Sequence, residues 1–303
     1  MGNKFALTDL VRSIVKVRPM HRKFIKKSVE NLSVEELNEL EKYLEYFSLL
    51  EINQKQLTNS YVTIVDDTFR EELYFRKIGS YRFKTFKEAQ SAVYDNESYM
   101  QSYMIGLALT AFLWENHTAL KRFFKRQLPL FSKRAGLYRE VGPGHGMYFI
   151  ESMRHCNFYR YEGIDVSSTS VAMTKKLIDS GFFGRFPNAN VLKQDFLSFV
   201  CNESAEVLVM GEVLEHVENP GAFLKRIYET TTSNPLVFIT TCINAPAIDH
   251  LYNPGTIGNL EKLFLDYGFA VQDRCVVPRA GTNLSTCESQ RLAINVAYLL
   301  GKL

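Results

Sequence analysis

The chain lacks the features that define several large classes of protein. None of its five cysteines belongs to a C-x-x-C pair, and their wide scatter predicts reduced thiols rather than disulfides or a zinc cluster. No apolar run is long enough to span a bilayer. The first residues contain neither the apolar core of a signal peptide nor a complete acylation motif. These absences predict a cytoplasmic protein with no membrane partner.

A strong net charge is also missing. The formal net charge of +3 is too small to indicate nucleic acid as a partner. With 46% hydrophobic and 23% charged residues, the 303-residue chain fits a soluble globular protein of one large domain or two smaller ones. Charge is concentrated only between Arg12 and Lys27, where seven basic residues stand without an acid. This segment is typical of a solvated helix face, and the alternative is a surface for an acidic partner.

The first part of the chain, residues 1–130, reads as helical and is predicted to form an N-terminal cap and substrate domain. Ser33 followed by Glu36 forms a capping box at the start of one helix. A longer helix is expected from about Glu97 to Arg126, closed by the segment Gln127-Leu128-Pro129.

The second part, residues 131–303, alternates short apolar strands with amphipathic helices, which predicts an α/β domain. The early strands are separated by helix-length segments, so we expect a Rossmann-like, doubly wound and mostly parallel sheet. The last two strands are joined by Pro278–Arg291 without a predicted helix, which favours an antiparallel C-terminal hairpin. The seven predicted strands are Leu137–Val141, Tyr161–Ile164, Ala189–Leu192, Val207–Met210, Leu236–Thr241, Phe269–Val277 and Leu292–Leu299.

A glycine-rich turn follows the first predicted strand and precedes a helix. Its glycines are Gly142, Gly144 and Gly146 in the string Glu-Val-Gly-Pro-Gly-His-Gly. Such turns let a ligand approach backbone N–H groups at a helix start. The dinucleotide fingerprint G-x-G-x-x-G is not met, because Met147 occupies the place of its last glycine. The spacing therefore indicates a cofactor other than a dinucleotide.

Three further elements end the next strands in order. Asp165 closes the second strand, about 20 residues after the glycine turn, where such folds place an acid against ribose hydroxyls. Asp195-Phe196 follows the third strand, and Gly211-Glu212-Val213-Leu214-Glu215-His216 follows the fourth. Ligands of open α/β sheets bind at this carboxyl edge of the strands. Each element alone has an ordinary structural explanation, but their joint order favours one binding site.

This set of motifs resembles the class I S-adenosylmethionine (SAM) dependent methyltransferases over roughly residues 135–300. The Glu-Val-Leu-Glu-His string is similar to that of ubiquinone-pathway O-methyltransferases. The resemblance implies SAM as cofactor and S-adenosylhomocysteine (SAH) as product, with Asp195 on the adenine amino group and Phe196 on its ring. The implied cofactor-binding residues are Glu140, Gly142, Pro143, Gly144, Gly146, Asp165, Val166, Asp195, Phe196, Gly211 and Glu212.

The residues after the fourth and fifth strands are the candidates for chemistry. Glu212, Glu215 and His216 stand at i, i+3 and i+4 and would share one face of a helix. His250 follows the fifth strand and should point into the same cleft. Either histidine would act as a general base in an enzyme without metal, which is the favoured reading. Alternatively, these four residues would hold a divalent metal, as in the similar methyltransferases of small-RNA 3′ ends.

The acceptor is expected to meet the helical domain. Tyr99 and Tyr103 share a helical face and would line the acceptor pocket, together with Asn244 and Tyr252 from the loop after the fifth strand. The leading hypothesis is O-methylation of a hydroxyl or carboxylate on a small molecule or peptide, as in natural-product tailoring. The alternatives are metal-dependent 2′-O-methylation of RNA and a SAM-binding regulatory protein without turnover. The sequence leaves the oligomeric state open.

Overall fold

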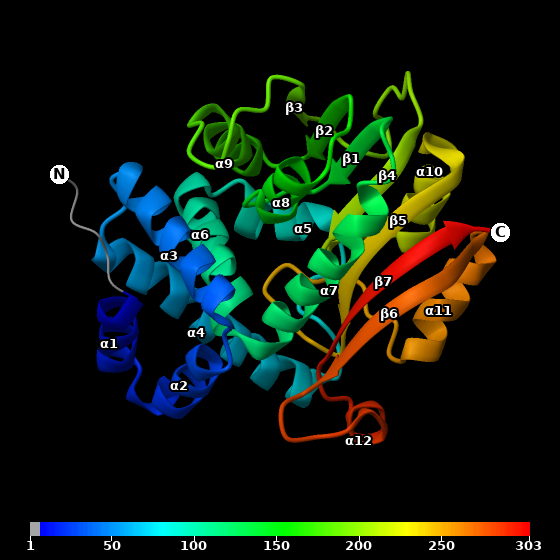
Figure 1. The fold of residues 1–303 in the computed structure, drawn as a ribbon. Helices are drawn as coiled ribbons and strands as arrows, with labels where there is room; N and C mark the ends of the chain where they lie inside the picture. The colour runs from blue at the N-terminus through cyan, green and yellow to red at the C-terminus, as the bar shows by residue number, and fades with distance from the viewer. Residues whose placement is uncertain (1–6) are drawn as a thin grey trace.

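The computed structural model describes residues 7–303. The prediction about a leader or acylation signal concerns residues 1–6 and lies outside the described residues. Figure 1 shows a group of helices at the N-terminal side and a twisted sheet at the other. None of the helices in the described range is long and apolar enough to cross a membrane. The N-terminal elements are α1 (Leu7–Val17), η1 (Pro19–His21), α2 (Arg22–Glu30), α3 (Val34–Leu49), α4 (Gln54–Ile78), α5 (Phe86–Ala89), η2 (Gln90–Tyr94), α6 (Glu97–Leu113) and α7 (Glu115–Phe131).

The N-terminal helices confirm the capping box and correct one boundary. The Ser33 hydroxyl accepts from the Glu36 backbone, and Glu36 accepts from the Ser33 backbone, which satisfies two free N–H groups. The helix predicted over Glu97–Arg126 is wrong as one unit, because Trp114 is extended (φ −122°, ψ 123°) and separates α6 from α7. The Trp114 indole donates to the Tyr61 hydroxyl at 3.0 Å. Pro129 does not end α7 either, since a proline in the last turn removes only one helical hydrogen bond.

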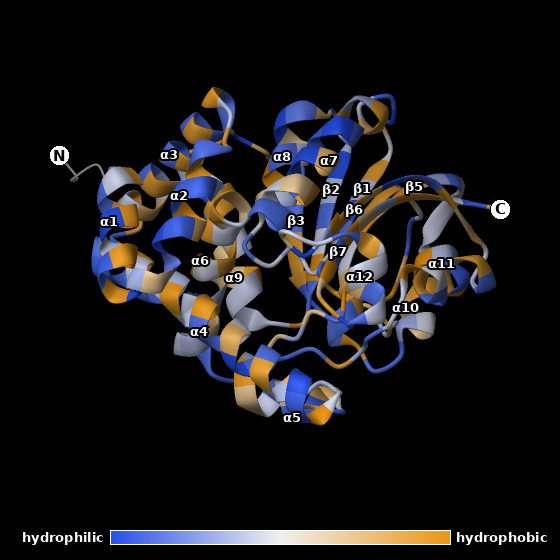
Figure 2. Ribbon diagram, turned by 90° about the horizontal axis from the view of Figure 1, so that it is seen from below, coloured by the Kyte–Doolittle hydropathy of each residue, from blue (hydrophilic) through white to orange (hydrophobic). Residues whose placement is uncertain are grey.

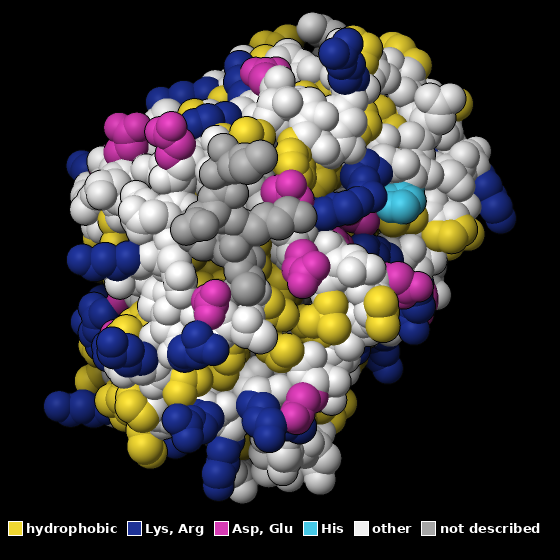
Figure 3. All heavy atoms as spheres, turned by 60° about the vertical axis from the view of Figure 1, so that its left-hand side comes forward, with side chains coloured by type: hydrophobic (Ala, Val, Ile, Leu, Met, Phe, Trp, Pro, Cys, Tyr) yellow, Lys and Arg dark blue, Asp and Glu magenta, His cyan; other side chains and the backbone are white. Residues whose placement is uncertain are grey.

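The basic segment from Arg12 to Lys27 forms the end of α1, η1 and most of α2. Two of its seven basic side chains pair with acids of other segments: Arg18 pairs with Asp66 and Lys27 pairs with Glu115. Figure 3 shows this side of the molecule, where Lys and Arg side chains are spread among apolar and acidic ones rather than gathered in one patch. The prediction of a solvated helix face agrees with this distribution.

The sheet has all seven predicted strands, in the order β3-β2-β1-β4-β5-β7-β6. The strands β3, β2, β1, β4 and β5 are parallel, and β7 lies antiparallel between β5 and β6, which confirms the mostly parallel sheet with an antiparallel C-terminal hairpin. Their bounds are β1 (Leu137–Val141), β2 (Arg160–Asp165), β3 (Ala189–Lys193), β4 (Ala205–Gly211), β5 (Thr231–Ile243), β6 (Phe269–Pro278) and β7 (Ile294–Lys302).

Helices cover both faces of the sheet, so successive residues of the central strands are buried on opposite sides. In β4, Val207 and Val209 belong to the core shared with α7 and α8, whereas Leu208 and Met210 belong to the core shared with α10 and α11. Figure 2 shows orange stretches in the sheet, between helices that carry both orange and blue residues, whereas β2 is largely blue. The remaining helices are α8 (Met147–His155), α9 (Ser168–Asp179), η3 (Leu214–His216), α10 (Pro220–Thr230), α11 (Ile257–Asp266) and α12 (Leu284–Ser289).

The short helix α12 corrects the prediction that Pro278–Arg291 contains no helix. Asn283 caps it, because its side chain accepts from the Thr286 N–H at 2.9 Å. The boundary predicted between residues 130 and 131 falls at the end of α7, and α7 packs on strands of the sheet. The division into two domains stays a prediction, and the cap and the sheet share one apolar core.

One charged side chain is completely buried at β1. Arg139 is 0% exposed, its Nε lies 3.0 Å from Glu162 on β2, and its two Nη atoms donate to the carbonyls of Thr230 and Glu203. The guanidinium thus joins strands β1 and β2 to the segments that precede β4 and β5. A buried arginine is tolerated here because its main donors have partners.

Replacing Arg139 by Leu should lower the free energy of unfolding by about 3–5 kcal/mol, because Glu162 would lose its buried cation. Urea denaturation followed by circular dichroism measures this. The matched control is Arg274→Leu, which breaks a surface pair with Glu261 at a side chain that is 51% exposed. That pair should contribute about 1 kcal/mol or less. Equal losses in the two variants would contradict the role given to Arg139.

Candidate functional site

A cavity of about 1050 Å³ lies at the carboxyl edge of the parallel strands, under the helical cap. This volume is at the upper end for a site that holds a single small ligand. All the predicted cofactor residues except Gly146 line it, as do both candidate catalytic histidines. The carboxyl ends of β1, β2 and β4 therefore meet as the sequence predicted.

The glycine turn forms one wall of the cavity. Gly142 has φ +67°, and a Cβ there would lie 2.6 Å from Val213 Cγ2, so only glycine fits. Gly146 does not line the cavity; it caps α8 with φ +80°, and a Cβ there would lie 2.9 Å from Leu177 Cδ2. Gly144 donates its backbone N–H to Asp165 at 3.3 Å, which links the turn to the end of β2. The turn leaves the cavity open where a side chain would otherwise fill it.

Asp165 is 8% exposed and carries acceptor atoms into the cavity. Its carboxylate accepts from the backbone of Ser167 at 2.8 Å and from Gly144. Burial raises the pKa of Asp165 to about 6, and these backbone donors partly oppose the rise. A vicinal diol would supply two more donors to the ionised form. The geometry suits the ribose-binding role that the sequence assigns to Asp165.

Binding of SAH should therefore weaken as the pH falls through about 6. The pKa of Asp165 is raised to about 6, so the carboxylate is ionised above that pH and protonated below it. Protonation removes one acceptor position. Calorimetric titrations from about pH 7.5 to about pH 5 should show a rising dissociation constant. The Asp165→Asn variant should bind weakly with little pH dependence across this range, and an equally steep profile in that variant would exclude Asp165 as the titrating group.

Among Glu140, Asp195 and Phe196, only Asp195 is exposed. Glu140 is buried and accepts from the Tyr138 hydroxyl at 2.6 Å, and burial raises its pKa to about 8. A cationic group in the cavity would favour its ionised form. Asp195 is exposed and accepts from the backbone of Leu197 at 3.0 Å, whereas Phe196 is buried with an apolar ring at the cavity wall. This pair can offer an acceptor and a ring surface to a heteroaromatic base.

The segment after β4 corrects the expected helix. Glu212 precedes η3 and has φ +52°, so Glu212, Glu215 and His216 do not share a face of one α-helix. Glu215 is fully buried and accepts from Thr241 at 2.7 Å. One carboxylate oxygen of Glu212 and one of Glu215 have no partner within the described residues. Burial, and then the charge of Glu212, raises the pKa of Glu215 well above its usual value. A proton or a cation would stabilise these two oxygens.

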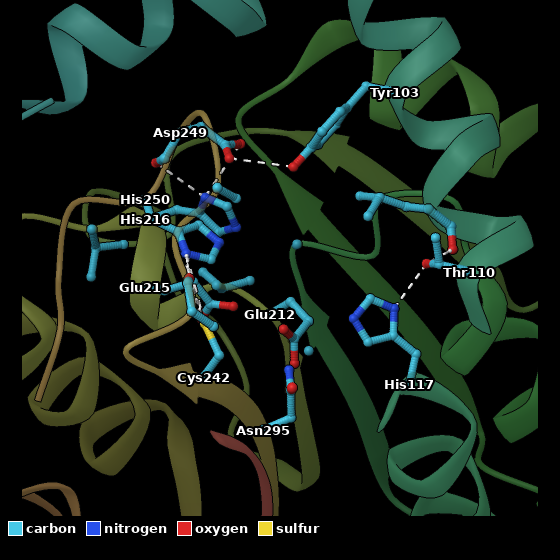
Figure 4. Close-up of a pocket in the computed structure, with 18 of the residues that line it drawn as sticks. Tyr103, Thr110, His117, Glu212, Glu215, His216, Cys242, Asp249, His250 and Asn295 are labelled. Atoms are coloured by element: carbon cyan, nitrogen blue, oxygen red, sulfur yellow. Dashed lines mark hydrogen bonds and ion pairs between the residues drawn. The ribbon is translucent and has the colours of Figure 1, made fainter. Parts of the chain in front are cut away.

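His216 and His250 stand together at the edge of the cavity, with ring centres 4.8 Å apart. His216 Nδ1 lies 3.3 Å from both the carbonyl oxygen and a carboxylate oxygen of Asp249. His250 Nδ1 lies 2.7 Å from the carbonyl oxygen of Ala245. Because these oxygens accept hydrogen bonds, each Nδ1 is suited to donate to them, which leaves Nε2 as the ring nitrogen available to the cavity. Figure 4 shows the two rings next to Asp249, with Glu215 and Cys242 beneath them.

The surroundings of the two histidines separate their chemistry. His250 is buried, and burial lowers its pKa to about 3, so it stays neutral at physiological pH. His216 is more exposed, and its Nδ1 faces a carboxylate oxygen of Asp249. This pairing of a histidine with a carboxylate is the usual way to orient a general base.

The donor atoms also fit a divalent cation, in two groups that share His250. Glu215, Cys242 and His250 hold donors within 4.8 Å of one another, and so do His216, Asp249 and His250. Glu212 belongs to neither group, so the predicted set of Glu212, Glu215, His216 and His250 is not brought together as one site. Imidazole and carboxylate donors suit divalent transition metals, and Nδ1–H bonds to oxygen are typical of ligand histidines.

A family model described as a methyltransferase domain matches residues 113–279, which is more than half of the chain. The chain belongs to this methyltransferase family. It is therefore a SAM-dependent methyltransferase with a Rossmann-like fold, and its cofactor is SAM. The match begins in the cap, at the end of α6, and ends just after β6. No curated protein sequence matches the chain.

Solved structures with a similar fold include methyltransferases and a cyclopropane synthase. The synthase, MmaA2 from Mycobacterium tuberculosis, is 14% identical with a TM-score of 0.49, covering 63% of this chain and 85% of its own. Magnesium protoporphyrin IX methyltransferase from Synechocystis, with bound SAH, is 11% identical with a TM-score of 0.47, covering 62% and 83%. The StiE O-MT structure is 13% identical with a TM-score of 0.49, covering 65% and 76%.

Of the four predicted acceptor residues, Tyr103 and Asn244 line the cavity of this methyltransferase, whereas Tyr99 and Tyr252 do not. The Tyr99 hydroxyl instead donates to Asp67 on α4, inside the cap. Asn244 donates to the carbonyl of Gly255 at 3.1 Å, so it holds the loop after β5 in shape. A shared helical face did not predict that both tyrosines line the cavity. The rings of Tyr99 and Tyr103 stack, but their hydroxyls contact different carboxylates, one in the cap and one after β5.

The sequence analysis missed several residues that the cavity brings together. Tyr94 donates to Asp249 at 3.0 Å, and Tyr103 donates to the other oxygen of Asp249 at 3.4 Å. On the opposite wall in Figure 4, His117 contacts Thr110 at 2.8 Å, and burial lowers the pKa of His117. The only sequence signal for Asp249 was its position beside His250. Tyr94 and His117 lie in the cap, where no motif marks them.

Proposed function

We propose that this methyltransferase transfers the methyl group to an oxygen of a small molecule or peptide, with the pair Asp249–His216 taking up the acceptor proton. The observation that carries the proposal is the contact of His216 Nδ1 with Asp249 at 3.3 Å, which would leave Nε2 as the base at the cavity. A hydroxyl needs such a base as the methyl arrives, whereas a carboxylate acceptor needs only orientation.

Each residue has a defined part in this reaction. SAM supplies a methyl group that is already activated by its sulfonium sulfur. Asp165 and the turn around Gly142 would hold the cofactor at the carboxyl ends of β1 and β2. His216 would accept the proton, and Asp249 would stabilise the imidazolium that forms. Because the methyl is activated, most of the catalysis would come from alignment of the acceptor in the closed cavity.

The cap makes the other half of the proposal. Residues 1–130 would form the substrate domain, since Tyr94 and Tyr103 from the cap hold Asp249 in place. The acceptor would thus be enclosed between α6 and the loop after β5. A large cap domain that carries none of the methyltransferase motifs favours a specialised acceptor, as in natural-product tailoring.

The direct test is to incubate the protein with methyl-labelled SAM and a metabolite extract of its source organism. We expect a labelled small molecule or peptide whose added methyl, placed by mass spectrometry and NMR, is on oxygen. A methyl on nitrogen or carbon would contradict O-methylation. A labelled RNA in a parallel total-RNA incubation, with no labelled metabolite, would favour the RNA hypothesis instead.

A metal-dependent enzyme is the second candidate, supported by the two donor groups around His250. The leading proposal predicts that dialysis against EDTA leaves methyl transfer within about twofold of the untreated rate, because a histidine base needs no cation. The metal site would be established if EDTA abolished activity and one divalent metal restored it. The same metal should then fail to restore activity in Cys242→Ser or His250→Ala. The control is SAH affinity, which should not change with EDTA in either case.

A further inference from the structure

The charges that line the cavity are divided between its two ends. Apart from Glu72 on α4, its acidic residues lie at or after the ends of β1 to β5, on the side predicted for the cationic cofactor. The connection between β6 and β7 returns to the same edge of the sheet, because β7 starts beside the end of β5, and it brings Arg279 and Arg291 to the cavity. Five strand spacings separate β2 from β6, about 24 Å. These arginines therefore lie far from Asp165.

The arginine end has more positive than negative charge. Arg279 and Arg76 both pair with the single carboxylate of Glu72 on α4. Arg291 has no carboxylate partner among residues 7–303, and it donates to the carbonyl of Gly79 at 2.9 Å and lies 4.9 Å from the Phe75 ring. This end thus has three guanidinium groups and one carboxylate, which pairs with two of them. Guanidinium groups recognise carboxylate and phosphate by paired hydrogen bonds.

The backbone at Arg291 is the second observation. Arg291 has φ +52° and stands just after the end of α12, where the Leu292 N–H bonds back to Cys287. Glycine usually occupies this left-handed position at a helix end. An arginine is held there although its backbone is strained. Backbone strain of this kind is concentrated at functional sites.

The cavity wall also has an apolar part. It includes Met104 and Leu107 of α6, Trp114 and Leu292. A neutral polar acceptor would gain little from such a wall, whereas burial of an apolar body is favourable. An acceptor that reaches from the base to the arginines must cross this surface. The shape and charge of the cavity therefore call for an amphipathic molecule.

We propose that the acceptor has an apolar body and carries a carboxylate, phosphate or sulfate group, which binds to Arg291 and Arg279 at the end of the cavity opposite the cofactor. This inference depends on the proposed function in one respect: it takes this end of the cavity to be the acceptor site. Arg291 is a specificity-determining residue in this account. Glu72 sets the local charge by neutralising part of the arginine cluster.

Two fluorescent probes test the proposal without any need for turnover. 8-Anilinonaphthalene-1-sulfonate and N-phenyl-1-naphthylamine share an apolar body and differ by a sulfonate. Each is titrated into the SAH-loaded protein. Arg291→Gly should weaken binding of the sulfonate probe about tenfold or more and leave the neutral probe unchanged. Glycine suits φ +52°, so this variant removes the guanidinium without adding backbone strain. Glu72→Gln should strengthen binding of the sulfonate probe.

Two controls make the result decisive. Glu51→Gly makes the same kind of change at another left-handed residue, with φ +59°, on a helix end away from the cavity, and should alter neither probe. Ala293→Trp should displace both probes, because Ala293 lines the cavity two residues from Arg291. The proposal is overturned if Arg291→Gly leaves the sulfonate probe bound as before, if it weakens both probes equally, or if both still bind to Ala293→Trp. Failure of methyl transfer to oxygen would leave these results intact.

Discussion

Replacing Asp165 by Ala should weaken the binding of SAM and SAH by two orders of magnitude or more. A hydrogen bond to a charged group contributes about 1.5–3 kcal/mol, and the ribose diol would lose two of them. The loss converts to at least about a hundredfold in the dissociation constant. Asp165 is buried at the end of β2, so solvent cannot replace the missing acceptor. Isothermal titration calorimetry with SAH gives the affinity directly.

The matched control for this prediction is Asp179→Ala. Asp179 is exposed at the end of α9, the helix that follows β2, and does not line the cavity. The Asp179→Ala variant should bind SAH with the same affinity as the unaltered protein. An unchanged affinity in Asp165→Ala, with normal folding, would remove Asp165 from the cofactor site. A similar loss in both variants would point to a general destabilisation.

Replacing His216 by Asn should reduce the turnover number for a hydroxyl acceptor by about two to four orders of magnitude, the usual contribution of a general base. The affinity for SAH should change little, since the loss concerns proton removal. The measurement compares methyl transfer under saturating SAM with calorimetric binding of SAH. A fall in SAH affinity as large as the fall in turnover would assign His216 to the cofactor instead.

Neighbouring variants separate the base from the residues that position it. Asp249→Asn should also lower turnover, because the amide can hold His216 in the wrong tautomer. Tyr94→Phe should have a smaller effect, since it removes only one of the hydrogen bonds to Asp249. His250→Ala should lower turnover more than cofactor affinity but less than His216→Asn, because burial keeps His250 a weak base. If His250→Ala lowered turnover more than His216→Asn, His250 rather than His216 would be the general base.

The sheet and the cofactor edge were predictable because their signals are local. Most strands are short apolar runs, and the parallel order of β1 to β5 places their carboxyl ends on one edge. The sharp turn after β1 requires a residue that tolerates positive φ, which is Gly142. A ribose diol requires a hydrogen-bond acceptor at the end of β2, which is Asp165. For these positions the residue type and its place after a strand already determine where the side chain goes.

The cap and the catalytic loop were harder to predict because distant contacts decide them. Nothing near Trp114 breaks a helix, and its bond to Tyr61 on α4 is visible only in three dimensions. Glu212 leaves the helical register because its φ of +52° is imposed where β4 ends. Asp249 gains its importance from Tyr94 and His216, which are far from it in sequence. Periodicity alone carries no information on such pairings.

A crystal structure with SAH bound tests the central claim most directly. The account predicts that the ribose hydroxyls contact Asp165, that the adenine lies beside Asp195 and Phe196, and that the sulfur faces the part of the cavity that contains Glu212 and His216. The space from there to Arg291 would remain open for the acceptor. A sulfur atom that faces away from His216, or an adenine in the space near Arg291, would contradict it.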